Sequence, residues 1–329
     1  MNHHNAAATQ FVMEASAAES MAQSLNLPSV LPLLPHLVQS TKLLARPPIS
    51  NYHVGAVGLG SDGRVFVGVN LEFPGLPLHH SVHAEQFLLT NLAVHRCPRL
   101  VAVAVSAAPC GHCRQFFQEI RYSSSLQILV IDEENWIKKI NLRESPDFKP
   151  LSKFLPHPFG PHDLLDQETP LLLEQHDNGL DLLNQNDEYI LENPNNVSNG
   201  NGNFSNGNCE KYEKNETLLR KAALEAANNA HAPYSGCPSG VALMDCEGKV
   251  YKGSYVESAA YNPSFGPVQA ALVAYVARGG SGYERIVEAA LVEEEGAKVR
   301  QEDTARLLLK AISPKCELRV FYCQSRKFM

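Results

Sequence analysis

The chain has 329 residues, of which 44% are hydrophobic and 19% charged, a composition typical of a soluble globular protein whose length favours two domains. Its formal net charge of −7 disfavours tight binding to a nucleic acid polymer, which needs clustered Lys and Arg. No apolar run has the length of a membrane span, and the first residues do not have the pattern of a secretory signal. We therefore expect a cytosolic protein whose cysteines are reduced thiols or metal ligands.

Two regions of the sequence repeat one another, and both predict alternating helices and strands. A shift of 185 places 62–68 (DGRVFVG) on 247–253 (EGKVYKG). In the first copy the pattern predicts, in chain order, a helix at 31–45, a strand at 54–60, a hairpin with a second strand, a helix at 84–94 and strands at 100–106 and 126–131. In the second copy it predicts the corresponding elements at 216–230, 240–244, 269–277, 286–292 and 318–322. Such alternation indicates two α/β domains, formed by duplication, each with a sheet that is covered on both faces and at least partly parallel.

The copies are separated by a segment of different composition, residues 172–216. Its Asn-rich run at 193–208 has almost nothing to bury, so we expect a flexible linker, with a partner-binding loop as the alternative. The predicted organisation is an N-terminal extension at 1–30, a first domain at 31–171, this linker, and a second domain at 217–329.

Residue types that bind metals cluster in the first copy. His83 opens the predicted helix at 84–94, and Pro109-Cys110-Gly-His-Cys113 follows a predicted strand. Pro109 suits the first turn of a helix, so the two cysteines, three residues apart, share one face near its N-terminus. One imidazole and two thiolates are ligands that zinc prefers. The sequence therefore predicts a zinc site made by His83, Cys110 and Cys113.

Three protein ligands leave the fourth position of zinc open, which is the pattern of a catalytic site. Glu85 follows His83 by two residues, where a carboxylate can take a proton from an activated water and pass it to a leaving group. A closed structural site would need a fourth ligand, for which His112, His79 and His80 are the candidates, and His80 could also replace His83. Ordinary thiols beside a hydrogen-bonded histidine are the remaining alternative. In a closed site Glu85 would have no purpose.

The second copy does not keep these residues. A shift of 186 gives the pairs His83 and Gln269, Glu85 and Ala271, Cys110 and Gly296, and Cys113 and Val299. The Arg-Gln pair at 114–115 is repeated at 300–301, so the alignment has not drifted. We therefore expect one zinc ion per chain, a catalytic first domain and a degenerate second domain that lacks the zinc ligands.

Four motifs taken together resemble the cytidine deaminase family, in its long two-domain form and especially as found in plants: Ser50-Asn-Tyr-His-Val-Gly55, Gly68-Val-Asn-Leu-Glu-Phe73, His83-Ala-Glu-Gln86 and Pro109-Cys-Gly-His-Cys-Arg-Gln115. The resemblance covers nearly the whole chain apart from its first residues and the Asn-rich segment. It implies duplicated three-layer α/β/α domains with mixed sheets, of which the second is degenerate.

The resemblance also implies a reaction, the hydrolysis of cytidine or 2′-deoxycytidine to uridine or 2′-deoxyuridine plus ammonia. Zinc activates the water that attacks C4, and Glu85 moves protons to N3 and to the leaving amine. Asn70 and Glu72 match residues that hold the ribose hydroxyls, and side chains two apart on a strand do face the same side. Their alternative is an ordinary strand end. Tyr52 stands where the family has an aromatic residue that contacts the base, and its alternative is an aromatic core residue.

Members of this long form are homodimers in which each active site is partly closed by the other subunit. We therefore expect a homodimer, in which the degenerate domain supplies shape without chemistry. Three other functions compete with nucleoside deamination. A polynucleotide cytosine deaminase should have a basic groove lined with aromatic residues, a nucleotide deaminase would place Glu72 near a phosphate, and a non-enzymatic zinc-binding interaction module would leave Glu85 without a use.

Overall fold

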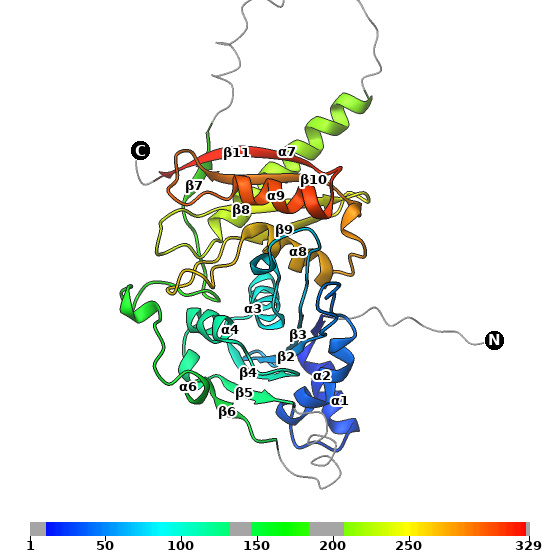
Figure 1. Cartoon of the computed structure of the whole chain (residues 1–329), viewed down its shortest axis with the longest axis vertical. Coiled ribbons are helices and arrows are strands. Elements are labelled where there is room, and N and C mark those ends of the chain that lie inside the picture. Colours follow the sequence, from blue (N-terminus) through cyan, green and yellow to red (C-terminus); the bar gives the residue numbers. More distant parts are fainter. Residues whose placement is uncertain (1–10, 132–145, 184–206, 327–329) are drawn as a thin grey trace, which may run out of the picture.

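The computed structural model describes residues 11–131, 146–183 and 207–326, with the side chains of 207–213 left out. Two domains lie one above the other along the longest axis of the molecule (Figure 1). Of the Asn-rich run at 193–208, residues 193–206 lie outside the described residues, so the prediction of a flexible linker there stays a prediction. Among the described residues, no helix combines the length and the apolar character that crossing a membrane requires.

The first domain is a six-stranded sheet with helices on both faces, in the strand order β1-β3-β2-β4-β5-β6. Only the β4–β5 pair is parallel, so the sheet is mixed, as predicted. Its elements are β1 (Val12–Met13), α1 (Ala15–Ser24), α2 (Leu34–Lys42), β2 (Gly55–Gly60), β3 (Val65–Val69), α3 (Ala84–Val94), β4 (Leu100–Val105), α4 (Gly111–Phe116), the 3₁₀ turn η3 (Phe117–Glu119), β5 (Gln127–Val130), β6 (Lys149–Pro150) and α6 (Leu151–Phe154).

The second domain has a five-stranded sheet in the order β7-β11-β10-β8-β9, again with one parallel pair, β10–β11. Its elements are β7 (Leu180–Leu182), α7 (Gly207–Asn228), β8 (Gly240–Asp245), β9 (Val250–Ser254), α8 (Pro267–Ala277), β10 (Ile286–Glu294), α9 (Glu302–Ile312) and β11 (Glu317–Ser325).

The strand registers confirm the duplication. Ala56 pairs with Gly68 and Val105, and Val241, which the shift of 185 places on Ala56, pairs with Gly253 and Leu291. Val105 and Leu291 are thus related by the shift of 186, which the sequence predicts for the part of the repeat beyond the hairpin. The order of the four shared strands is also the same in both sheets, so each copy folds by the same plan.

Each sheet lies between two helical layers, which confirms the three-layer prediction. In the first domain α1 and α2 cover one face of the sheet and contribute to one apolar cluster, while α3 lies on the other face. Gly68 allows this close packing, because a Cβ at that position would collide with the carbonyl of Ala84 in α3. Gly253 has the same function in the second domain, where a Cβ would collide with the carbonyl of Pro267.

The domains share one core. Helices α3 and α8 pack against each other at the boundary (Figure 1), and one buried cluster includes Leu88 and Leu92 of α3 with Leu272 and Tyr275 of α8. Both helices are buried nearly all round, because each is covered on one side by its own sheet and on the other by the opposite domain.

Three segments outside the predicted domain boundaries belong to the two domains, and one of them, residues 207–216 of the predicted linker, is the first part of α7. Residues 12–24, assigned from the sequence to an N-terminal extension, form β1, which pairs with β3, and α1, whose Ala18 and Ala22 are buried. Residues 180–182, assigned to the linker, form β7, which pairs with β11, and Leu180 is buried. Both strands are too short to carry a periodic pattern, so only their tertiary pairing reveals them.

Candidate metal centre and active site

His83 is held at the start of α3 by its neighbours in sequence. Val82 pairs with Leu71 through two backbone hydrogen bonds of 2.9 Å, which continue the edge of the sheet to the residue before His83. The backbone of His83 is extended, and its N–H donates to Oε1 of Gln86 in the first turn of the helix. The imidazole therefore projects from the N-terminus of α3.

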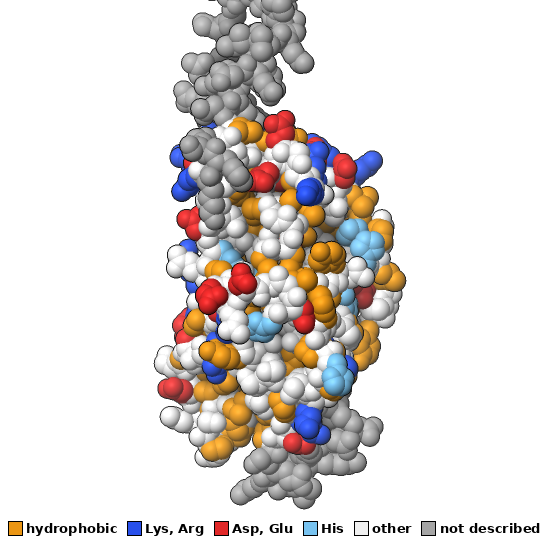
Figure 2. Space-filling model, turned by 90° about the vertical axis from the view of Figure 1, so that its left-hand side faces the viewer, with side chains coloured by type: hydrophobic (Ala, Val, Ile, Leu, Met, Phe, Trp, Pro, Cys, Tyr) orange, Lys and Arg blue, Asp and Glu red, His pale blue; other side chains and the backbone are white. Residues whose placement is uncertain are grey.

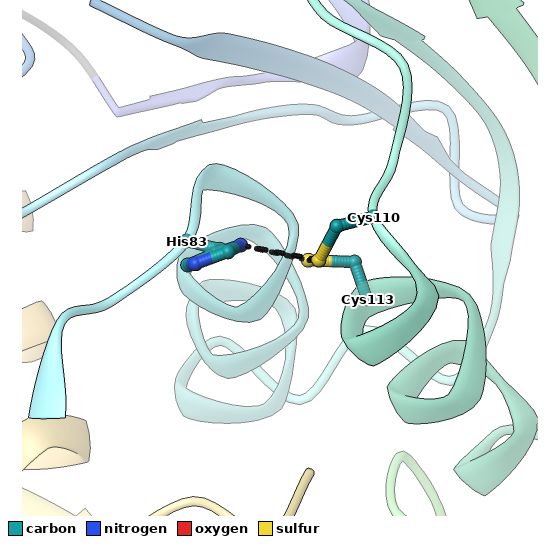
Figure 3. A group of neighbouring side chains, drawn as sticks. All are labelled: His83, Cys110 and Cys113. Carbon is teal, nitrogen blue, oxygen red and sulfur yellow. Dashed lines mark hydrogen bonds between the residues drawn. The ribbon is translucent and has the colours of Figure 1, made fainter. Parts of the chain in front are cut away.

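The two cysteines come from the loop between β4 and α4. Cys110 has an extended backbone and caps α4, and its carbonyl accepts the helical hydrogen bond from the N–H of Arg114. Cys113 lies in the first turn, so both sulfurs point out of the same end of the helix toward His83 (Figure 3). Arg114 fixes this loop, because its Nε donates to the carbonyl of Pro109 at 2.7 Å.

The distances within this group are those of a tetrahedral zinc site. Nδ1 of His83 lies 3.6 Å from Sγ of Cys110 and 3.3 Å from Sγ of Cys113, and the two sulfurs are 3.7 Å apart. Zinc bonds of about 2.3 Å to sulfur and about 2.0 Å to nitrogen at tetrahedral angles require separations of about 3.8 Å between sulfurs and about 3.5 Å between sulfur and nitrogen. The three residues therefore fit zinc without rearrangement.

The protonation of the two thiols also favours a cation between them. Hydrogen bonds from Cys113 and from His83 lower the pKa of Cys110 to about 3. The hydrogen bond with Cys110 and the burial of the side chain raise the pKa of Cys113 well above its usual value. A divalent cation at this position would replace the proton of Cys113 and stabilise both thiolates.

The group is open on one side. Cys113 is buried, whereas His83 and Cys110 are exposed. Glu85 lies in the first turn of α3 and is only 4% exposed. Burial raises the pKa of Glu85, and His83 and Cys113 lie near enough to act on that pKa. A carboxyl group of this kind can hold a proton close to the metal position.

The candidates for a fourth protein ligand make other contacts. Nε2 of His112 donates to the carbonyl of Asn262 in the second domain at 2.7 Å. The rings of His79 and His80 lie against each other, 4.2 Å apart. Within the described residues, the only His, Cys, Asp or Glu group with metal-binding spacing is His83 with Cys110 and Cys113. This geometry disfavours a closed structural site and the replacement of His83 by His80.

The comparisons with known proteins agree with the geometry. Two family models, both described as a cytidine and deoxycytidylate deaminase zinc-binding region, match residues 33–127 and 151–306. Cytidine deaminase 1 of Arabidopsis thaliana is 55% identical over 314 residues, which cover 95% of this chain and 97% of that protein. The chain belongs to the cytidine deaminase family.

Two other relatives are less similar to this chain, and their names differ in the activity that they state. Cytidine deaminase 6 of the same plant is 46% identical, over 88% of this chain and 91% of that protein. A protein named probable inactive cytidine deaminase 4 is 38% identical, over 87% of each chain. In this chain the group of His83, Cys110 and Cys113 is present.

Asn70 and Glu72 lie beyond the end of β3 and hold the loop that precedes β2. The side chain of Asn70 accepts from the N–H of Val54 and donates to the carbonyl of Tyr52, both at 2.9 Å. The carboxylate of Glu72 accepts from the N–H groups of Ile49 and Ser50 at 2.9 Å and from the Ser50 hydroxyl at 2.6 Å. The hydrogen bond with Cys110 raises the pKa of His83, and the charges of Cys110, Glu85 and Glu72 add to this rise.

Tyr52 lies in the same loop and is 61% exposed. This exposure excludes a role as a core residue within the chain and leaves the ring free for another contact. The structure also gives importance to Glu119, which sequence reasoning missed. Glu119 follows Cys113 by six residues and is completely buried against the second domain. One sequence offers no signal for it, because a carboxylate that another domain buries looks like any exposed one.

Proposed function

We propose that this family member hydrolyses cytidine and 2′-deoxycytidine to uridine and 2′-deoxyuridine plus ammonia, as a zinc enzyme of pyrimidine salvage in the cytosol. The observation that carries the proposal is the group of His83, Cys110 and Cys113 at zinc-binding distances, open to solvent and flanked by the buried Glu85. The relatives named cytidine deaminase support the choice of substrate.

His83, Cys110 and Cys113 would hold the zinc, which when bound acidifies water and so supplies a nucleophile at neutral pH. Glu85 accepts a proton from the attacking water and delivers it to N3 of the pyrimidine. It then takes the remaining proton from the new hydroxyl group at C4 and transfers it to the amino group at C4. The C4–N bond breaks, ammonia leaves, and the oxygen stays as the carbonyl of the product. Burial suits Glu85 to this work, because the raised pKa lets its carboxyl group hold a proton between the two transfers.

We assign Asn70 and Glu72 to the sugar of the substrate. Glu72 already accepts three hydrogen bonds, which leaves its carboxylate about one acceptor position, and Asn70 keeps one N–H free. These are the groups that a pair of sugar hydroxyls needs. Tyr52, exposed in the loop that both residues hold, is proposed to contact the base.

The charge of the site favours a free nucleoside over a phosphorylated substrate, because Glu72 would repel a phosphate group. On the face shown in Figure 2, the Lys and Arg side chains are scattered among Asp and Glu and do not form a continuous band. A groove for a nucleic acid strand would need such a band.

The test is ammonia release from cytidine, 2′-deoxycytidine, CMP, adenosine and single-stranded DNA, each at the same concentration. We expect release from the first two substrates only. Release from CMP or DNA without release from cytidine would contradict the proposal.

We further propose that the enzyme is a homodimer. Exposed apolar side chains lie in segments that contact the site residues or their neighbours, among them Tyr52, Phe159 and Tyr261, and a partner subunit would cover them. Sedimentation combined with activity measurement tests this proposal, and a monomer with full activity would contradict it.

A further inference from the structure

The helix that carries the cysteines rests on the second domain. Its residues at positions 112, 116 and 119 follow a spacing of four and three, which places them on one face. Nε2 of His112 donates to the carbonyl of Asn262 at 2.7 Å, and the ring of Phe116 lies 6.1 Å from that of Phe265. Glu119, in η3, accepts from the N–H of Ala259 at 2.8 Å. Residues 259–265 thus support the whole of this face.

Of these three residues, Glu119 has the most partners in the second domain. Besides Ala259, its carboxylate accepts from the phenol of Tyr234 at 2.7 Å and lies 3.2 Å from Nε2 of His231. Glu119 and His231 are at most 1% exposed. All three partners of the carboxylate belong to the second domain. A carboxylate removed from water is tolerated only where such partners replace the lost hydration. These contacts therefore help to fix where η3 lies, together with the N–H of Leu172, which donates to the carbonyl of Glu119 at 2.9 Å.

The helix needs this support because it is short. Six residues of α4 and three of η3 are too few to form a stable helix alone. From its own domain the helix is held on another side, where Arg114 donates to the carbonyl of Phe154 at 3.0 Å and Gln115 donates to that of Phe159 at 2.5 Å. The helix is therefore held on one side by its own domain and on another by the second domain.

The residues that hold Glu119 are particular to the second copy. The shift of 185 places His231 on Arg46 and Tyr234 on Ile49. Arg46 donates instead to carbonyls of Gly280 and Ser281. The second domain thus lacks the zinc ligands, but at these two positions it has the imidazole and the phenol that hold Glu119, where the first copy has Arg46 and Ile49.

We propose that Glu119 is a positioning residue through which the zinc-free domain orients the zinc-binding helix, and so sets zinc retention and turnover. The expected effect on turnover rests on the proposed function, whereas the expected effect on zinc retention does not depend on it. Glu119 does not contact the metal position; it acts through the helix that carries Cys113.

The test replaces Glu119 by Gln, which keeps the shape but presents N–H donors to the donors of the second domain. Glu119→Gln should release zinc to a chelator about tenfold faster and lower kcat about tenfold, the low end of the effect of residues that orient metal ligands. KM for cytidine should change less than twofold, because the sugar-binding loop is not touched.

The matched control is Glu293→Gln. Glu293 is also 1% exposed and accepts from the N–H of Gln301 at 2.7 Å and from Nε of Arg300 at 3.0 Å, all within the second domain. It should lower the melting temperature as Glu119→Gln does, while zinc release and kcat of the folded protein stay at the wild-type values. The proposal is overturned if Glu119→Gln releases zinc at the wild-type rate, or if Glu293→Gln accelerates release equally.

Tyr234→Phe removes one donor to Glu119 with almost no change of shape, so it tests the contact even if Glu119→Gln does not fold. We expect zinc release about threefold faster than in the wild type, the size of one lost hydrogen bond of about 0.7 kcal/mol. Release at the wild-type rate would overturn the proposal. If the wild type binds zinc but does not deaminate cytidine, the proposed function fails, and the ratio of release rates still decides the role of Glu119.

Discussion

The two domains share strand order, register and helix packing, and they differ in the residues at the N-termini of the equivalent helices. The first presents His83 and Glu85 there, and the second presents Gln269 and Ala271. The loop anchor is kept in both, since Glu257 accepts from the N–H groups of Tyr234 and Ser235 as Glu72 does from those of Ile49 and Ser50. The frame therefore does not depend on the metal.

This comparison also separates the two residues assigned to the sugar. The zinc-free domain keeps the loop anchor, with Glu257 in the place of Glu72, so part of the role of Glu72 is to hold a loop. Asn70 has no such counterpart, because the shift of 185 places it on Tyr255. The contrast supports the assignment of Asn70 to the substrate more strongly than that of Glu72.

The largest expected effect comes from removing a zinc ligand in one domain and its counterpart in the other. His83→Ala should lose the zinc and all measurable turnover, because two thiolates alone do not retain the ion in an open site. Gln269→Ala should keep both, and Oε1 of Gln269 accepts no hydrogen bond that would be lost. Elemental analysis and ammonia release measure the pair, and zinc loss in Gln269→Ala would break the comparison.

Glu85→Gln should keep one zinc per chain and lower kcat about 10³- to 10⁴-fold, because the amide cannot carry protons between water and substrate. Steady-state kinetics with zinc analysis of the same sample measures this. A variant that turns over cytidine at more than a tenth of the wild-type rate would rule out the proton-transfer role.

Asn70→Ala should raise KM for cytidine about tenfold, the size of one or two lost hydrogen bonds to the sugar. The control substrate is 1-methylcytosine, which has no sugar, so its turnover should be the same in the variant and the wild type. An equal loss with both substrates would mean that Asn70 acts only by holding the loop at 52–54.

Glu72→Gln and Glu257→Gln should lower the melting temperature by similar amounts, and only Glu72→Gln should raise KM. Burial raises the pKa of Glu72, but the hydroxyl and N–H of Ser50 and the N–H of Ile49 together bring it below its usual value. The stabilisation from this lowered pKa is therefore present above the unfolded pKa of about 4.3 and is lost as the pH falls through the lower folded value. Melting temperatures of wild type and Glu72→Gln measured from pH 7 to 3 should converge at the acidic end. A constant difference would contradict a stabilising role of the Glu72 carboxylate in the loop anchor.

Much of the frame was predictable because its elements are long and periodic. The helix predicted at 84–94 has those bounds in the structure, and the repeat predicted which strands correspond. The zinc group was predictable because its spacing is a local property of two helix starts. The strands β1 and β7 and the buried Glu119 were not, because each is defined by a partner far away in the sequence, and a local pattern carries no record of such a partner.

The most direct test of one active and one zinc-free domain is the zinc content per chain, measured together with cytidine turnover on one preparation during stepwise removal and return of the metal. We predict one zinc per chain at saturation, with turnover proportional to zinc up to that ratio. Saturation at two zinc ions per chain, or turnover that persists after all zinc is removed, would contradict the account.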